Sequence, residues 1–123
     1  MPTLTEGGYA QGFIISEGNG TISRENGTLI SGQNLKAGRI LGRITTGGKL
    51  TAVAPAAGDG SQTAAAILMA DTDASGGDKA CAILARNAEV NRAELDFGAL
   101  DAGQQTTAIA QLATLGIIVR AGI

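Results

Sequence analysis

GRILGRITTGGKLTAVA, residues 38–54, is the stretch that decides the fold, because a glycine pair separates two short segments rich in apolar residues. Gly38–Ile44 and Lys49–Ala54 both have the length of a strand, and the pair Gly47-Gly48 can adopt positive φ at little steric cost. Pro55 ends the second segment because it has no N–H to donate to a strand ladder. The stretch therefore predicts a β-hairpin with a glycine turn.

The segments around this hairpin also have the composition of short strands. After a turn at Asp59-Gly60, Ala64–Ala70 is followed by an aspartate-rich loop, and its short length favours a strand over a helix. KACAILARNAEV, residues 79–90, predicts a further strand, in which Cys81, Ile83 and Ala85 alternate on one buried face. These segments indicate a mainly β fold.

Asn26-Gly27 predicts a second hairpin nearer the N-terminus. A two-residue type I′ turn needs φ > 0 at both central residues, and Asn-Gly is the strongest short signal for it. Thr21–Glu25 and Thr28–Ser31 would be the two strands of this hairpin.

One helix is predicted, near the C-terminus. Asp101 can cap its first turn, with Gln104 three residues later in a capping-box arrangement, and Gly116 provides the C-terminal stop. Ile117–Arg120 then predicts a closing strand. One face of the helix is apolar: Ala108, Ile109, Leu112 and Leu115.

Composition excludes several classes of function. The chain has 123 residues with a formal net charge of −2, and its charged residues are interspersed, so nothing indicates binding to nucleic acid or to an anionic membrane. It has no histidine, the most versatile general base near neutral pH, and one cysteine, Cys81, inside an apolar run. No basic-apolar leader and no apolar run of about 18 residues is present. We expect a non-enzymatic chain made in the cytoplasm, with a buried, inert thiol.

Two motifs that resemble ligand-binding loops are incomplete. DTDASGGD, residues 71–78, resembles the start of a calcium loop, but Ala82 stands where the bidentate glutamate is needed. Gly47-Gly48-Lys49 resembles part of a phosphate loop, but Arg43 and Leu50 occupy required positions. We therefore expect no catalytic residue, no cofactor and no metal site.

Residues 1–20 differ from the rest of the chain, because they are glycine-rich and polar apart from Phe13, Ile14 and Ile15. One interpretation is a flexible arm whose apolar segment needs another surface to cover it. The other is a terminal strand that docks on the chain's own body. Arg24 has two interpretations as well. It is either a solvated residue on a strand face, or a residue whose guanidinium donates hydrogen bonds to carboxylates or backbone carbonyls at an interface.

Three stretches of the chain together resemble the phage head decoration proteins of the lambda type. They are TEGGYAQGFIISEGNGTISREN (5–26), LKAGRILGRITTGGKLTAVAPAAGDGSQTAAAIL (35–68), and the pair RNAEVN and AIAQLATLGIIVR (86–91 and 108–120). The resemblance follows the family's order through nearly the whole chain. It is therefore more specific than any single motif.

The resemblance implies a mainly β, β-clip-like compact domain with one C-terminal helix, residues 21–123, and a capsid-binding N-terminal arm, residues 1–20. It implies homotrimers on the outside of the expanded phage capsid, at three-fold and local three-fold positions, bracing the major capsid protein against the pressure of packaged DNA. The arm would order on binding and add a strand to the shell's sheet. The residues expected to face the capsid are Phe13, Ile14, Ile15, Ser23, Arg24 and Glu25.

Two other classes of β-rich protein remain as alternatives. A phage tail or fibre component would have a similar composition, and binding to capsid shells would separate it from a decoration protein. A biotinyl- or lipoyl-carrier-like domain needs an acceptor lysine at a hairpin tip. Lys49 is the only hairpin lysine, and it lacks the usual neighbours of such an acceptor.

Overall fold

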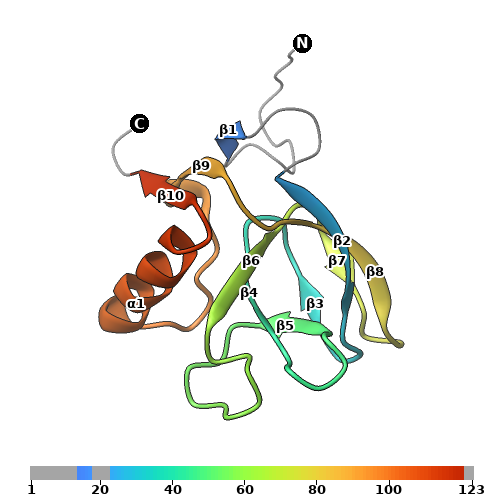
Figure 1. The fold of residues 1–123 in the computed structure, drawn as a ribbon. Coiled ribbons are helices and arrows are strands. Elements are labelled where there is room, and N and C mark those ends of the chain that lie inside the picture. The colour runs from blue at the N-terminus through green and yellow to red at the C-terminus, as the bar shows by residue number, and fades with distance from the viewer. Residues whose placement is uncertain (1–13, 18–22, 121–123) are drawn as a thin grey trace.

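The computed structural model describes residues 14–17 and 23–120 (Figure 1). Ten strands and one α-helix make up most of this part of the chain, which confirms the prediction of a mainly β domain with a C-terminal helix. The strands are β1 (Ile14–Glu17), β2 (Arg24–Leu29), β3 (Asn34–Leu35), β4 (Ile40–Arg43), β5 (Leu50–Ala52), β6 (Ala64–Leu68), β7 (Thr72–Asp73), β8 (Lys79–Leu84), β9 (Ala88–Asn91) and β10 (Ile117–Arg120). The helices are α1 (Ala102–Ala113) and a 3₁₀ turn, η1 (Arg92–Glu94).

Five strands close into a small barrel in the order β2-β5-β4-β6-β8. The hairpin predicted from residues 38–54 forms two adjacent strands of this barrel. In it β4 pairs with β5 in antiparallel register, with Leu41 opposite Ala52. Gly47 and Gly48 in the connection have φ of 89° and 75°, which confirms the glycine turn. The predicted strand at Ala64–Ala70 is also confirmed as β6, and it ends two residues earlier than expected.

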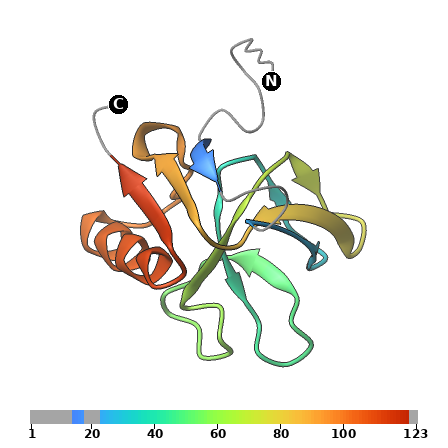
Figure 2. The same cartoon turned by 45° about the horizontal axis from the view of Figure 1, so that its top comes forward.

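A second layer covers one outer side of the barrel. It is a three-stranded sheet in the order β1-β9-β10, together with α1 (Figure 2). In this sheet β1 pairs antiparallel with β9, whereas β10 pairs parallel with β9. The predicted closing strand Ile117–Arg120 is therefore confirmed, and it lies at one edge of the sheet.

The α-helix begins as the sequence predicts. Oδ1 of Asp101 accepts the backbone N–H of Gln104 at 2.8 Å, and Oε1 of Gln104 accepts the backbone N–H of Asp101 at 3.1 Å, so the capping box is complete. Ala108 and Leu112 face the core, and Gly116 beyond the helix has a φ of 83°. This glycine turns the chain from α1 into β10.

Two apolar clusters lie on opposite faces of the barrel wall. One fills the barrel interior, and the other lies between the wall and the layer of α1, β9 and β10. Neighbouring residues of the wall strands point to opposite clusters. The pairs, outer cluster first, are Ile40 and Leu41 in β4, Ile67 and Leu68 in β6, and Leu84 and Ile83 in β8.

The prediction of a hairpin at Asn26-Gly27 is wrong. Both residues lie inside β2, which runs unbroken along β8, with Asn26 opposite Ala82 and Gly27 opposite Cys81. A Cβ on Gly27 would lie 2.6 Å from Cδ1 of Leu50, so a larger residue here would have to displace the end of that side chain inside the barrel. The segment predicted as one strand at residues 79–90 is two strands, because Asn87 has a φ of 54° and bends the chain between β8 and β9.

Candidate functional site

The residues expected to bind a capsid lie on two segments that meet at the corner between β8 and β9. Phe13 lies outside the described residues. Glu17, the last residue of β1, is opposite Ala88, and the Ser23 side chain contacts the neighbouring residue Asn87. The structure therefore brings β1 and the start of β2 to one place, although residues 18–22 separate them in the sequence.

β1 is docked on the body of the chain. Ile14 is half-buried, lies opposite Val90 of β9 and packs against the outer apolar cluster. The register of the pairing shifts between Ile14 and Ser16, so the strand is irregular around Ile15. Of the two interpretations of this segment, strand docking holds for Ile14–Glu17 in the isolated chain.

Ser23 is fully buried and anchors the start of β2. Its Oγ donates to the carbonyl oxygen of Asn87 at 2.7 Å, and its own carbonyl accepts the N–H of Ala85 at 2.8 Å. A side chain with no exposed surface cannot contact a partner directly in this conformation. Ser23 instead fixes the direction in which the chain enters the barrel.

Arg24 and Glu25 line the same open hollow of about 440 Å³, together with Asn26 and Ala82. Arg24 is half-buried and Glu25 is exposed. Glu25 lies at the barrel mouth, where its carboxylate pairs with Arg86, and its Oε1 lies 3.8 Å from Nη2 of Arg43. Glu25 therefore pairs with two arginines of its own chain, and the Arg24 side chain beside it is partly exposed.

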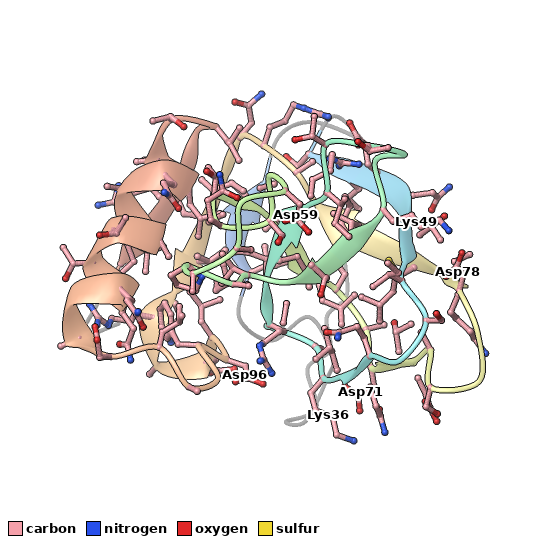
Figure 3. All side chains as sticks on the ribbon, turned by 90° about the horizontal axis from the view of Figure 1, so that it is seen from below. Lys36, Lys49, Asp59, Asp71, Asp78 and Asp96 are labelled. Atoms are coloured by element: carbon pink, nitrogen blue, oxygen red, sulfur yellow. The ribbon has the colours of Figure 1, made fainter. Side chains whose placement is uncertain are left out.

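The aspartate-rich segment after β6 makes local contacts. Oδ1 of Asp71 accepts the N–H of Ala37 at 2.8 Å, and its Oδ2 lies 3.8 Å from Nζ of Lys36 (Figure 3). Oδ1 of Asp73 accepts the hydroxyl of Ser75 at 2.6 Å, and this hydrogen bond is the main reason that the pKa of Asp73 lies below its ordinary value. These two carboxylates accept hydrogen bonds from nearby loop residues. Residues 14–17 and 23–120 contain no group of three potential metal ligands.

Lys49, the hairpin lysine that a carrier domain would modify, forms an ion pair. Its Nζ lies 2.5 Å from Oδ2 of Asp78. Figure 3 labels both residues. The hydrogen bond from Lys49, with a second one from the N–H of Ser31, holds the pKa of Asp78 below its ordinary value. Cys81 is buried in the barrel, and burial raises the pKa of its thiol. A raised pKa makes the reactive thiolate scarce at neutral pH.

One concave feature was not found from the sequence. A hollow of about 250 Å³ lies between one side of α1 and the β5–β6 connection. Gln104, Thr107, Ala108 and Gln111 line it at helical spacing, and this spacing is the signal that could have revealed one side of it. The other side comes from a loop that no local pattern places there. We call it the helix hollow; it is also lined by Val53, Pro55, Gln62 and Leu100.

Among the residues that the structure describes, no helix has the length and hydrophobicity to cross a membrane. Comparison with known proteins gives one family match. The model of the family described as bacteriophage lambda head decoration protein D matches residues 3–117, and no curated protein matches the chain. The match includes both segments of the candidate site, the barrel, and the covering layer as far as the start of β10. The chain belongs to the family of bacteriophage lambda head decoration protein D.

Proposed function

We propose that this chain binds the outside of the expanded phage capsid as a homotrimer, at three-fold and local three-fold positions, and braces the major capsid protein against packaged DNA. A capsid decoration role follows from membership of the family. The observation that carries the finer proposal is the extent of the family match, which spans residues 3–117 and so includes the proposed arm as well as the body.

Residues 1–20 are the proposed shell-binding arm, and β1 supports this assignment. It is a short edge strand whose only strand partner in the described chain is β9. No other described strand pairs with its second edge, which could therefore form main-chain hydrogen bonds to a strand of the shell, a mode in which the backbone supplies affinity and alternate side chains supply fit. Phe13, Ile14 and Ile15 are the proposed apolar contacts.

Ser23, Arg24 and Glu25 have different roles in this proposal. Arg24 contacts the shell, because its side chain is partly exposed and lines an open hollow. Ser23 and Glu25 set the direction of the arm, through Asn87 and through the arginines at the barrel mouth. Each contact is modest, and the repetition of sites on a symmetric shell makes the total binding strong.

The experiment is co-sedimentation with expanded empty shells of the cognate major capsid protein. Four proteins are compared: the full chain, a chain lacking residues 1–13, a chain lacking residues 1–20, and Arg24→Ala. We expect saturable binding of the full chain at one copy per capsid subunit. Both deletions should abolish binding, and the shorter one should keep the melting temperature because β1 is retained.

The Arg24→Ala variant should weaken binding more than it lowers the melting temperature. Deletion proteins that bind like the full chain would contradict the assignment of the arm. A full chain that does not bind expanded shells at all would contradict the decoration proposal itself and favour a tail or fibre component.

A further inference from the structure

Asn26-Gly27 has the local chemistry of a turn but lies inside a strand. Asparagine followed by glycine is also the dipeptide most prone to deamidation, because glycine has no side chain to shield its backbone nitrogen and its backbone rotates freely. The chain has two such pairs, Asn19-Gly20 and Asn26-Gly27, and only the second lies within the described residues.

Deamidation of this pair is a ring closure between neighbouring residues. The backbone nitrogen of Gly27 loses its proton and attacks Cγ of Asn26. An N–Cγ bond forms, the Cγ–Nδ2 bond breaks, and Nδ2 leaves with that proton as ammonia. One water then opens the succinimide ring. It breaks either the new N–Cγ bond, which gives aspartate, or the bond from this nitrogen to the main-chain carbonyl carbon of Asn26, which gives isoaspartate with the chain continuing through Cγ.

The ladder between β2 and β8 holds the nitrogen that would attack. The two strands run side by side (Figure 1), and Gly27 is opposite Cys81. The N–H of Ala85 donates to the carbonyl of Ser23 at 2.8 Å where β2 begins. Opposite residues of an antiparallel ladder alternate between hydrogen-bonded and non-hydrogen-bonded pairs, so the pair four residues further along, Gly27 and Cys81, is again hydrogen-bonded.

The neighbouring pair, Asn26 and Ala82, agrees with this alternation. The carbonyl of Ala82 accepts the N–H of Met69, the residue that follows β6, at 3.0 Å, so it points away from β2. The Asn26 side chain is exposed and lines the open hollow beside β2. Water therefore reaches the amide group of Asn26, and the nitrogen of Gly27 is the reactant that the fold withholds.

The extended backbone of β2 also has the wrong geometry for ring closure. The ring forms only when rotation about ψ of Asn26 brings the nitrogen of Gly27 toward Cγ, and an extended residue keeps this nitrogen turned away from its side chain. The rotation would break the pair of Gly27 with Cys81 and part the two strands. The closed barrel therefore prevents a reaction that the dipeptide itself favours.

We propose that Asn26-Gly27 is a latent modification site, which is unreactive in the closed barrel and is converted to isoaspartate or aspartate only while β2 is separated from β8. Isoaspartate adds a main-chain carbon to β2, so the residues on its two sides no longer both match β8, and the barrel does not close again in its native register. Aspartate keeps the main chain and adds a negative charge beside Glu25. The site turns opening of the barrel into a permanent covalent change, whatever the chain binds.

The first measurement compares reaction rates at Asn26. The full chain and a synthetic peptide of residues 23–31 are incubated at one pH and temperature, each with and without urea. Trypsin cleaves after Arg24 and Lys36, and tandem mass spectrometry of the fragment 25–36 separates reaction at Asn26 from reaction at Asn34. The native chain should react at least about a hundredfold more slowly than the peptide, because only opened chains react, and the chain in urea should match the peptide.

The second measurement tests whether a modified barrel closes. Asn26→Gln is the matched control, since it keeps an amide but would have to close a larger ring, which is much slower. Both chains carry Asn19→Gln, so that the other asparagine-glycine pair does not contribute. After incubation in urea and dilution, circular dichroism should show that the refolded fraction falls in step with isoaspartate content, while Asn26→Gln refolds fully. Fresh Asn26→Asp should refold, which separates the charge from the added main-chain carbon.

A native chain that reacts at Asn26 as fast as the peptide would overturn the protective role of the ladder. Absence of reaction at Asn26 in urea would overturn the site itself. A chain rich in isoaspartate that refolds as completely as Asn26→Gln would overturn the claim that opening becomes permanent. Co-sedimentation of the unmodified chain with shells is unaffected by each of these outcomes, so the capsid role is tested separately.

Discussion

Replacement of Gly42 by alanine should strongly destabilise the chain. Gly42 is buried in β4, and a Cβ there would lie 2.2 Å from the carbonyl oxygen of Ser61 and 2.7 Å from its Cα. Ser61 cannot move freely, because its N–H and hydroxyl both donate to Oδ1 of Asp59 and its carbonyl accepts the N–H of Ala54 at 2.9 Å. The added methyl group must therefore displace an anchored loop.

The size of this effect follows from two contributions. Overpacking of a tight site costs about 1–3 kcal/mol, and loss of the hydrogen bond from Ala54 to Ser61 adds about 1 kcal/mol. The free energy of unfolding should fall by about 2–4 kcal/mol in total, and the melting temperature by about 10 °C for a domain of this size.

Urea unfolding followed by circular dichroism measures the change. Gly58→Ala is the matched control, since Gly58 belongs to the same loop, has no positive φ, and a Cβ there meets nothing within 4 Å. A Gly42→Ala chain with a free energy of unfolding within about 1 kcal/mol of the wild type would refute the reasoning, because it would mean that the loop around Ser61 can move at little cost.

Three further predictions concern single side chains. Ser23→Ala leaves the buried contact with the Asn87 carbonyl unmade, so urea unfolding should show a loss of about 1–2 kcal/mol; no loss would mean that water replaces the hydroxyl. The pKa of Asp78 is lowered, so its contribution to stability is fully present above its ordinary pKa of about 4 and is lost as the pH falls below that value through the lowered pKa. Asp78→Asn should therefore flatten the acid limb of a plot of melting temperature against pH, and an unchanged limb would contradict this. The Cys81 thiol should react with Ellman's reagent roughly a hundredfold faster in urea than in the native chain, and equal rates would show that the barrel opens readily.

The elements that the sequence predicts well are those with local causes. The glycine turn between β4 and β5 depends on residues that sit in the turn itself, and the start of α1 depends on the reciprocal hydrogen bonds of Asp101 and Gln104. The short length of Ala64–Ala70 and its flanking turns were enough to identify β6 in spite of its helix-forming alanines.

The errors come from contacts between residues distant in the sequence. Asn26-Gly27 has the local chemistry of a turn, but β8 pairs along the whole of β2 and holds both residues in an extended ladder. Gly27 also packs against the side chain of Leu50, which lies 23 residues away in the sequence and reaches this position only when the barrel closes.

The same reasoning applies to the candidate site. Ser23, Arg24 and Glu25 are consecutive residues, but the sequence cannot assign the directions of their side chains. Burial of Ser23 depends on Asn87, and the environment of Glu25 depends on Arg43 and Arg86, all from other strands. Which of the three can meet a partner is therefore a property of the closed barrel.

The barrel wall that separates the two apolar clusters has a thermodynamic consequence. Ile40 and Leu41 are consecutive residues of β4, yet each belongs to a different cluster, and the same holds for Ile67 and Leu68 in β6. Detachment of α1 and β10 exposes one face of strands whose other face is the barrel interior, so neither cluster can be lost while the other stays intact. The described body should unfold in one cooperative transition, with the same midpoint for probes placed on the helix and inside the barrel.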